Sequence, residues 1–155
     1  MTESLDATDW AILGELQEDA RLSLTELGRR VNLSASATTE RVRRLESIGV
    51  ITGYRAELDL TKVGYPVLAV VRLKYPGNKH EPLHRLLERR GEILECLRTT
   101  GDDCYTLKVA AASMPHLEEL VNELTDFGST TTNLVYSQTQ RYRGPQKPVT
   151  EHAQG

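Results

Sequence analysis

The sequence predicts an α+β protein of two domains, because its hydrophobic pattern changes character near Gly64 and Pro66. Before this point apolar residues recur at helical spacing in successive segments, and after it β-branched runs alternate with helical patterns. A chain of 155 residues is long enough for two small domains. We expect a first domain over residues 1–60, a linker over 61–66, a second domain over 67–143 and a mobile tail over 144–155.

Capping residues predict three helices in the first domain. Asp6 and Asp9 are spaced to cap the first helix, and Ser23-Leu-Thr-Glu26 forms a capping box that opens the second. A tight turn over residues 32–34 leads into the third, which Ser34 caps and which runs to Ser47. The order of helix, short turn and helix is that of a helix-turn-helix.

A small β-hairpin is predicted directly after the third helix. Gly49 suits the end of that helix, and residues 50–59 carry β-favouring side chains on either side of a glycine. A third helix followed by a β-wing is the winged variant of the helix-turn-helix. Within the wing, Arg55 either reaches a phosphate or is simply solvated, and the sequence leaves both open.

The third helix has one apolar and one polar side. Thr38, Val42 and Leu45 fall on a single stripe that faces a core. Hydroxyl and guanidinium groups on the other side are of the kind that contact phosphates and base edges, which predicts a DNA recognition helix. The alternative is an ordinary amphipathic helix with a solvated basic face. The candidate DNA-binding residues are Ser36, Thr39, Glu40, Arg43 and Arg44, with Arg41 kept for a phosphate or a structural ion pair.

The net charge of -3 is distributed unevenly along the chain. Residues 1–28 hold one arginine against seven carboxylates, a balance of -6, whereas residues 29–55 hold six arginines against two glutamates, a balance of +4. A compact basic patch in an acidic protein favours a local DNA footprint over binding through the whole surface.

The second domain reads as a β-α-β-β-α-β sequence, which is the ferredoxin-like arrangement. Helices cover one face of such a sheet, so we expect the other face to be covered, plausibly by a second copy of the chain. The predicted elements are a strand over 67–75, a helix over 81–90, a strand over 93–100, a turn over 101–103, a strand over 104–112, a helix with Pro115 in its first turn, and a last strand over 133–142.

The cysteines and the apolar runs argue against a zinc protein, a membrane-spanning protein and a secreted protein. Cys96 and Cys104 lack the spacing of a zinc site, and we interpret them as buried reduced thiols rather than as a disulfide or metal ligands. The longest apolar run, over residues 67–71, is far too short to span a bilayer, and the N-terminus lacks the features of a signal peptide. We therefore expect a cytoplasmic protein with no cofactor.

A set of residues in both halves of the chain stands at the spacing of a known protein family. These residues are Leu5, Asp6, Asp9, Ile12, Leu13, Leu16, Arg21, Leu27, Leu33, Ser34, Ser36, Arg41, Val42, Arg44, Leu45, Glu46, Gly49, Val50 and Ile51, with a G-x-x-D-Y loop matched by residues 101–105. Through them the chain resembles, over essentially its whole length, the Lrp/AsnC family of leucine-responsive, feast/famine transcriptional regulators. The resemblance implies a winged helix that binds operator DNA as a dimer, often within larger homo-oligomers, and an amino acid or related effector bound between regulatory domains.

Two positions depart from the family pattern. Cys104 stands where the family loop usually carries an aspartate, so a carboxylate that pairs with an α-ammonium group would have to come from elsewhere. In the third helix, Thr38 stands where the family prefers an apolar residue. The resemblance implies that polar groups of this loop and of the segment before the last strand bind the effector. The alternative is that the loop is only a hairpin turn and that the threonine-rich segment only leads into the strand. These candidates are Thr100, Gly101, Asp102, Asp103, Cys104, Ser129, Thr130, Thr131, Thr132 and, more weakly, Ser137.

Two further functions are compatible with the two-domain pattern. Sirohaem decarboxylases resemble the same two-domain pattern, so a tetrapyrrole-modifying enzyme is the alternative from another class, although the histidines form no recognisable catalytic group. His80 and His84 lie four residues apart at a helix start, where they either bind a metal or face solvent, and solvent is the preferred interpretation. The remaining alternative is an interaction module whose helix-turn-helix has lost DNA binding.

Overall fold

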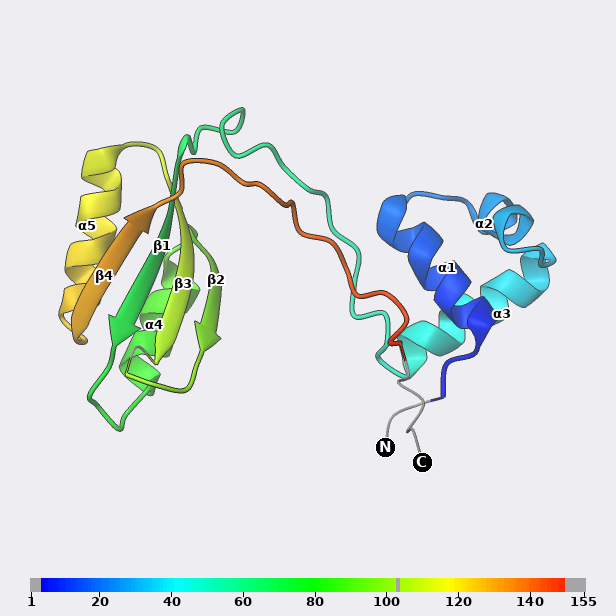
Figure 1. Ribbon diagram of the computed structural model, residues 1–155, viewed down its shortest axis with the longest axis horizontal. Coiled ribbons are helices and arrows are strands. Elements are labelled where there is room, and N and C mark those ends of the chain that lie inside the picture. The colour runs from blue at the N-terminus through cyan, green and yellow to red at the C-terminus, as the bar shows by residue number, and fades with distance from the viewer. Residues whose placement is uncertain (1–3, 103, 150–155) are drawn as a thin grey trace. The chain divides into compact units, whose positions relative to one another are not determined.

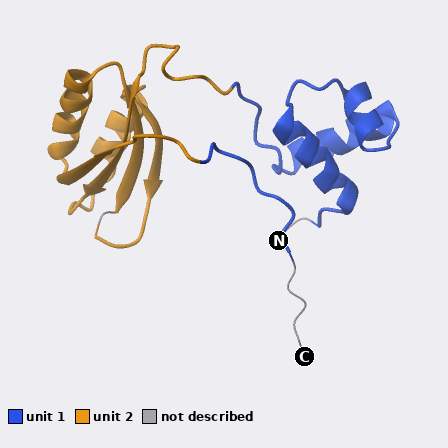
Figure 2. Cartoon of the chain, turned by 45° about the horizontal axis from the view of Figure 1, so that its top comes forward, with its two compact units in different colours: residues 1–56, 140–155 blue, residues 57–139 orange. Residues whose placement is uncertain are grey.

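The computed structural model describes residues 4–102 and 104–149, and it divides the chain into two compact units. Unit 1 comprises residues 1–56 together with 140–155, and unit 2 comprises residues 57–139 (Figure 2). The helical first part and the βαββαβ second part confirm the predicted α+β class. None of the described helices is both long and apolar enough to cross a bilayer.

Unit 1 is built from α1 (Ala7–Glu18), α2 (Leu24–Arg30) and α3 (Ala35–Ser47) (Figure 1). The predicted caps are confirmed for each, with side-chain oxygens of Asp6, Ser23 and Ser34 accepting a hydrogen bond from a backbone N–H of the first turn. Ile12, Leu27, Val42 and Leu45 form the buried core of this unit.

The turn between α2 and α3 brings the two helices close together at Gly28. Asn32 adopts a left-handed conformation with φ of 57°, which asparagine tolerates better than most residues. Gly28 faces α3, and a Cβ atom placed on it would lie 2.7 Å from both the Leu33 carbonyl oxygen and the Thr38 Oγ1. The helix-turn-helix predicted from the sequence is therefore confirmed, with a glycine at its tightest point.

The predicted β-hairpin wing is wrong. The end of α3 is as expected, since Gly49 has φ of 73° and the N–H groups of Gly49 and Val50 donate to the carbonyl oxygens of Glu46 and Leu45. Beyond it, however, the described residues 50–66 contain no strand. The β-favouring side chains lack a pairing partner within their own segment, and residues 60–64 form a turn in which the Tyr65 N–H donates to the Leu60 carbonyl oxygen.

The C-terminal segment belongs to unit 1. The Gln17 side-chain amide donates to the Pro145 carbonyl oxygen at 3.3 Å, and the Arg55 guanidinium lies 5.7 Å from the centre of the Tyr142 ring. Contacts within this unit therefore reach from α1 to residues close to the C-terminus. The predicted mobile tail extends into residues 150–155, which lie outside the described residues.

Unit 2 contains a four-stranded sheet with the order β2-β3-β1-β4, and its neighbouring strands are antiparallel. This order confirms the ferredoxin-like arrangement. Its elements are β1 (Val67–Lys74), α4 (Glu81–Arg89), β2 (Ile93–Arg98), β3 (Tyr105–Ala111), α5 (Met114–Thr125) and β4 (Ser129–Leu134) (Figure 1).

The core of unit 2 lies on one face of the sheet. Alternate residues of β1 and β3, among them Val71 and Leu107, pack against Leu83 of α4 and Leu120 of α5, and these side chains are fully buried. Because side chains alternate along a strand, the intervening residues of β1 and β3 point to the face that α4 and α5 leave open.

The last strand begins four residues earlier than predicted. Residues 133–142 are the predicted strand, but β4 covers Ser129–Leu134 and pairs with β1 from Lys74 opposite Ser129 to Ala69 opposite Leu134. The threonine run that we expected before the strand forms the strand itself, because threonine has high β-propensity and β1 offers it an unpaired edge. Ser137 therefore lies beyond β4.

Candidate functional site

The polar face of α3 is exposed along most of its length. Ser36, Glu40 and Arg43 are exposed, and Thr39 is half-buried. The Thr39 hydroxyl donates to the Ala35 carbonyl oxygen at 2.7 Å. The hydroxyls of Ser36 and of the cap residue Ser34 lie 3.1 Å apart. This face combines hydroxyl, carboxylate and guanidinium groups on a helix that is fixed by its cap.

Arg43 differs from the other arginines of α3 in having a free guanidinium. Within residues 4–102 and 104–149, its side chain has neither an ion pair nor a hydrogen bond. A guanidinium that is exposed and uncommitted keeps its full set of donors for a phosphate or for the edge of a guanine.

Arg41 and Arg44 lie on the flank of α3 that packs against the start of α1. Arg41 donates to Asp6 at 2.8 Å and to Asp9 at 2.9 Å, and Arg44 donates to Asp9 at 2.6 Å. The carboxylate of Asp6 first accepts from the backbone N–H of Asp9, and this bond together with Arg41 holds the pKa of Asp6 below its ordinary value. The sequence placed Arg44 among the DNA-reading residues, whereas the structure places it in an ion pair within unit 1.

Glu26 neutralises part of the basic patch on α2. Its carboxylate accepts from Arg29 at 2.7 Å and from Arg30 at 3.2 Å, and these two hydrogen bonds lower its pKa to about 2. Arg30 also donates to Glu15 of α1 at 2.9 Å. Among the three arginines of α3, only Arg43 has no acidic partner within the described residues.

Arg55 is exposed and contacts an aromatic ring of the C-terminal segment. Its guanidinium lies against the Tyr142 ring, which is a cation–π contact that neither sequence alternative included. The partners of Arg41 and Arg44 were also missed, although a signal was present, because two arginines spaced i, i+3 point to the same side of a helix and an acidic capping box opens α1.

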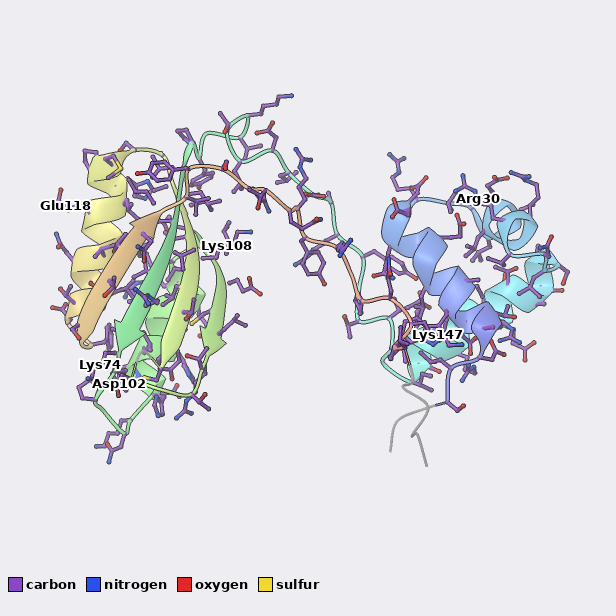
Figure 3. All side chains as sticks on the ribbon, in the orientation of Figure 1. Arg30, Lys74, Asp102, Lys108, Glu118 and Lys147 are labelled. Atoms are coloured by element: carbon purple, nitrogen blue, oxygen red, sulfur yellow. The ribbon has the colours of Figure 1, made fainter. Side chains whose placement is uncertain are left out.

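The loop candidates for the effector lie at one end of the sheet in unit 2. Gly101 has φ of 99°, and Thr100, Gly101 and Asp102 are exposed. Asp102 lies 3.8 Å from the ammonium group of Lys74, at the end of β1 (Figure 3). Asp103 lies outside the described residues. The Cys104 thiol sulfur accepts from the backbone N–H of Tyr75 at 3.4 Å and so faces β1 rather than the loop.

The strand candidates for the effector divide into three groups. Ser129 pairs with Lys74 and so lies at the same end of the sheet as Asp102, and Thr131 follows on the same face. Thr130 and Thr132 point to the face that carries α4 and α5. Ser137 follows the end of β4 at the opposite end of the sheet, so it does not join the loop residues. Lys74 was missed, since a lysine ending a strand carries no distinctive sequence signal.

A hydrogen-bonded histidine lies behind this loop. Arg98 contacts His80 Nε2 at 3.2 Å, and because arginine only donates, the imidazole is neutral and its Nδ1–H donates to the buried Tyr105 hydroxyl at 2.8 Å. Burial, followed by Arg98 and His84, lowers the pKa of His80. The described residues contain no group of three acidic, histidine or cysteine side chains placed to hold a metal ion. Cys96 and Cys104 are free thiols that are half-buried rather than fully buried as predicted.

Both units match known protein families. Residues 5–46 match the AsnC-type helix-turn-helix domain, and residues 68–145 match the Lrp/AsnC ligand binding domain. The chain is 36% identical over 140 residues to the HTH-type transcriptional regulator LrpC of Bacillus subtilis, which covers 90% of this chain and 97% of LrpC.

Solved structures show the same likeness. The structure of B. subtilis LrpC matches with a TM-score of 0.86 over 90% of this chain and 100% of that one. A feast or famine regulatory protein from M. tuberculosis complexed with L-methionine matches with a TM-score of 0.86 at 31% identity, over 93% of this chain and 100% of that one. These relatives are transcriptional regulators, which favours regulation over tetrapyrrole chemistry. The chain belongs to the Lrp/AsnC family of DNA-binding transcriptional regulators, with an AsnC-type helix-turn-helix followed by a ligand-binding domain.

Proposed function

We propose that α3 reads operator DNA through Ser36, Thr39, Glu40 and Arg43. The free guanidinium of Arg43 on an exposed helix face is the observation that carries this assignment. In a helix-turn-helix the second helix of the motif enters the major groove, where base edges can be read. Unit 1 has no net charge, because its ten Lys and Arg residues are balanced by ten Asp and Glu residues. Glu26, Asp6 and Asp9 pair with neighbouring arginines, so sequence reading depends on few cations.

Replacing Arg43 by alanine is expected to weaken binding to the DNA upstream of the protein's own gene by about 1–3 kcal/mol, the value of a good arginine–base pair. The measurement is a titration of fluorescent duplex DNA at several salt concentrations. Arg85→Ala, which removes an exposed cation from α4 of unit 2, is the matched control and should leave the affinity unchanged. Equal affinities of wild type and Arg43→Ala at every salt concentration would remove Arg43 from the interface.

We infer that unit 2 binds an α-amino acid at the end of the sheet where Lys74, Asp102 and Ser129 meet. A zwitterion needs a cationic partner for its carboxylate and an anionic partner for its ammonium group. Lys74 and Asp102 offer both within 3.8 Å of each other, and Asp102 supplies the carboxylate that Cys104 lacks. Support comes from two solved relatives, the M. tuberculosis protein above and a Neisseria meningitidis regulator in complex with L-Met, which is 29% identical with a TM-score of 0.83 over 89% of this chain and 94% of that one.

A thermal-shift titration of the full chain with L-methionine tests this assignment. Ligand at about 100 times its dissociation constant is expected to stabilise unit 2 by about 2.7 kcal/mol. Asp102→Asn should abolish the shift, whereas Glu118→Gln, on the exposed surface of α5 (Figure 3), should preserve it. The α-keto analogue, which lacks the ammonium group, should stabilise neither variant. A shift that survives Asp102→Asn would place the ligand elsewhere.

We further propose that the open face of the sheet joins two copies of the chain. Leu97 is 51% exposed on this face, and Leu68 and Val70 are half-buried there, so apolar surface remains in contact with water in the single chain. An effector bound beside this face would alter the pairing of two regulatory units and hence the spacing of two recognition helices.

A further inference from the structure

We propose that Asp9 is the positioning residue of the recognition helix: it clamps Arg41 and Arg44 to the start of α1, so that α3 meets DNA through the Arg43 face alone. This inference rests on the proposed function of α3 and adds a residue that does not itself touch DNA. It also reassigns Arg44 from reading DNA to holding the helix.

The clamp is built around a carboxylate that is almost completely buried. The Asp9 side chain is 1% exposed, and its two oxygens accept from Arg41 at 2.9 Å and from Arg44 at 2.6 Å. One of these oxygens also accepts the backbone N–H of Asp6 at 3.1 Å, which completes the capping box of α1. A buried carboxylate with this many donors is fully paired, which offsets the cost of removing it from water.

The clamp supplies a constraint that the apolar stripe cannot. Contacts of Val42 and Leu45 with the core are non-directional, so they hold α3 against α1 but resist small rotations about the helix axis only weakly. Charge-assisted hydrogen bonds from a planar guanidinium are directional. Two of them on one flank fix the rotation of α3, and with it the direction in which Arg43 points.

Asp9 also sets how much positive charge the helix presents. For Arg44 to reach a phosphate it would have to leave a buried carboxylate with one donor fewer, which is costly. Arg44 therefore stays on Asp9, and α3 offers one uncommitted cation instead of three. A helix with few free cations gains less from non-specific phosphate contacts, so a larger share of its affinity depends on the base sequence.

The test compares Asp9→Asn and Arg44→Gln with wild type by titrating upstream DNA and an unrelated duplex across salt concentrations. Arg44→Gln should leave the slope of log K against log salt unchanged. Asp9→Asn should steepen it by about 0.9, because one released cation contacts a phosphate, and should lower the ratio of specific to non-specific affinity. The double variant should return to the wild-type slope. A shallower slope for Arg44→Gln, or an unchanged slope and ratio for Asp9→Asn, would overturn the proposal.

Side-chain NMR of the free protein separates this proposal from the DNA-binding function. The guanidinium protons of Arg44 should exchange slowly with water in the wild type and rapidly in Asp9→Asn. Asp6→Asn is the control, because the Asp6 side chain is 53% exposed and does not contact Arg44, and this variant should leave the Arg44 protons protected. Rapid exchange in the wild type means that there is no clamp. Failure of the wild type to bind any DNA would instead remove the proposed function, whatever the exchange rates show.

Discussion

Gly28→Ala is expected to destabilise unit 1 by roughly 1–3 kcal/mol, the usual cost of inserting a methyl group into a filled site. Its Cβ would lie 2.7 Å from the Leu33 carbonyl oxygen, a backbone atom that can move only if the whole turn moves. The same Cβ would press on the Thr38 hydroxyl, which donates to the Ser34 carbonyl oxygen at 2.8 Å. Moving either atom away from the added methyl group therefore separates α2 from α3.

Gly14→Ala is the matched control because a Cβ on Gly14, in the middle of α1, meets nothing within 4 Å. Alanine there is expected to stabilise the helix by roughly 0.5–1 kcal/mol. Urea denaturation followed by the fluorescence of Trp10, the single tryptophan of the chain, reports on unit 1 directly. The prediction fails if both variants shift the midpoint in the same direction.

Leu107→Ala is expected to destabilise unit 2 by about 2–5 kcal/mol, the range for truncating a buried leucine. Leu107 is fully buried in β3, between the neighbouring strands and the helices that cover the sheet. The cavity left behind would face the centre of the core, where the surrounding strands cannot collapse to fill it. Circular dichroism at increasing temperature would show the loss, while the Trp10 signal of unit 1 should keep its midpoint.

Leu97→Ala, on the open face of the neighbouring strand β2, serves as the control for this variant. The side chain is 51% exposed, so its truncation should change the stability of the single chain very little. If the open face joins two copies, however, the same change should shift the protein toward smaller species in sedimentation analysis. A normal assembly size for Leu97→Ala would exclude this leucine from the contact between copies.

The parts of the fold that local chemistry determines could be predicted from the sequence. The caps at Asp6, Ser23 and Ser34 and the turn at Asn32 each satisfy backbone groups within a few residues, so a short stretch contains the whole cause. The strand order of unit 2 followed from its βαββαβ pattern, because few connections between such elements are physically allowed.

The parts that depend on distant partners could not be predicted. Residues 129–132 were predicted to precede the last strand, whereas pairing with the edge of β1 makes them part of it. The hairpin wing looked plausible from its residue types, but strand formation requires pairing that types alone cannot provide. Arg44 looked like a DNA-reading residue until the structure placed Asp9 against it, 35 positions away in the sequence.

The composition of β4 has a consequence for the solubility of the protein. The strand lies at the edge of the sheet, spans 6 residues and consists of hydroxyl and amide side chains apart from its final leucine. Exposed strand edges invite other chains to extend the sheet, and short polar edges discourage this because they offer little apolar surface to bury. Open-ended growth into fibrils is therefore resisted at this edge, which directs association of the chain toward closed assemblies.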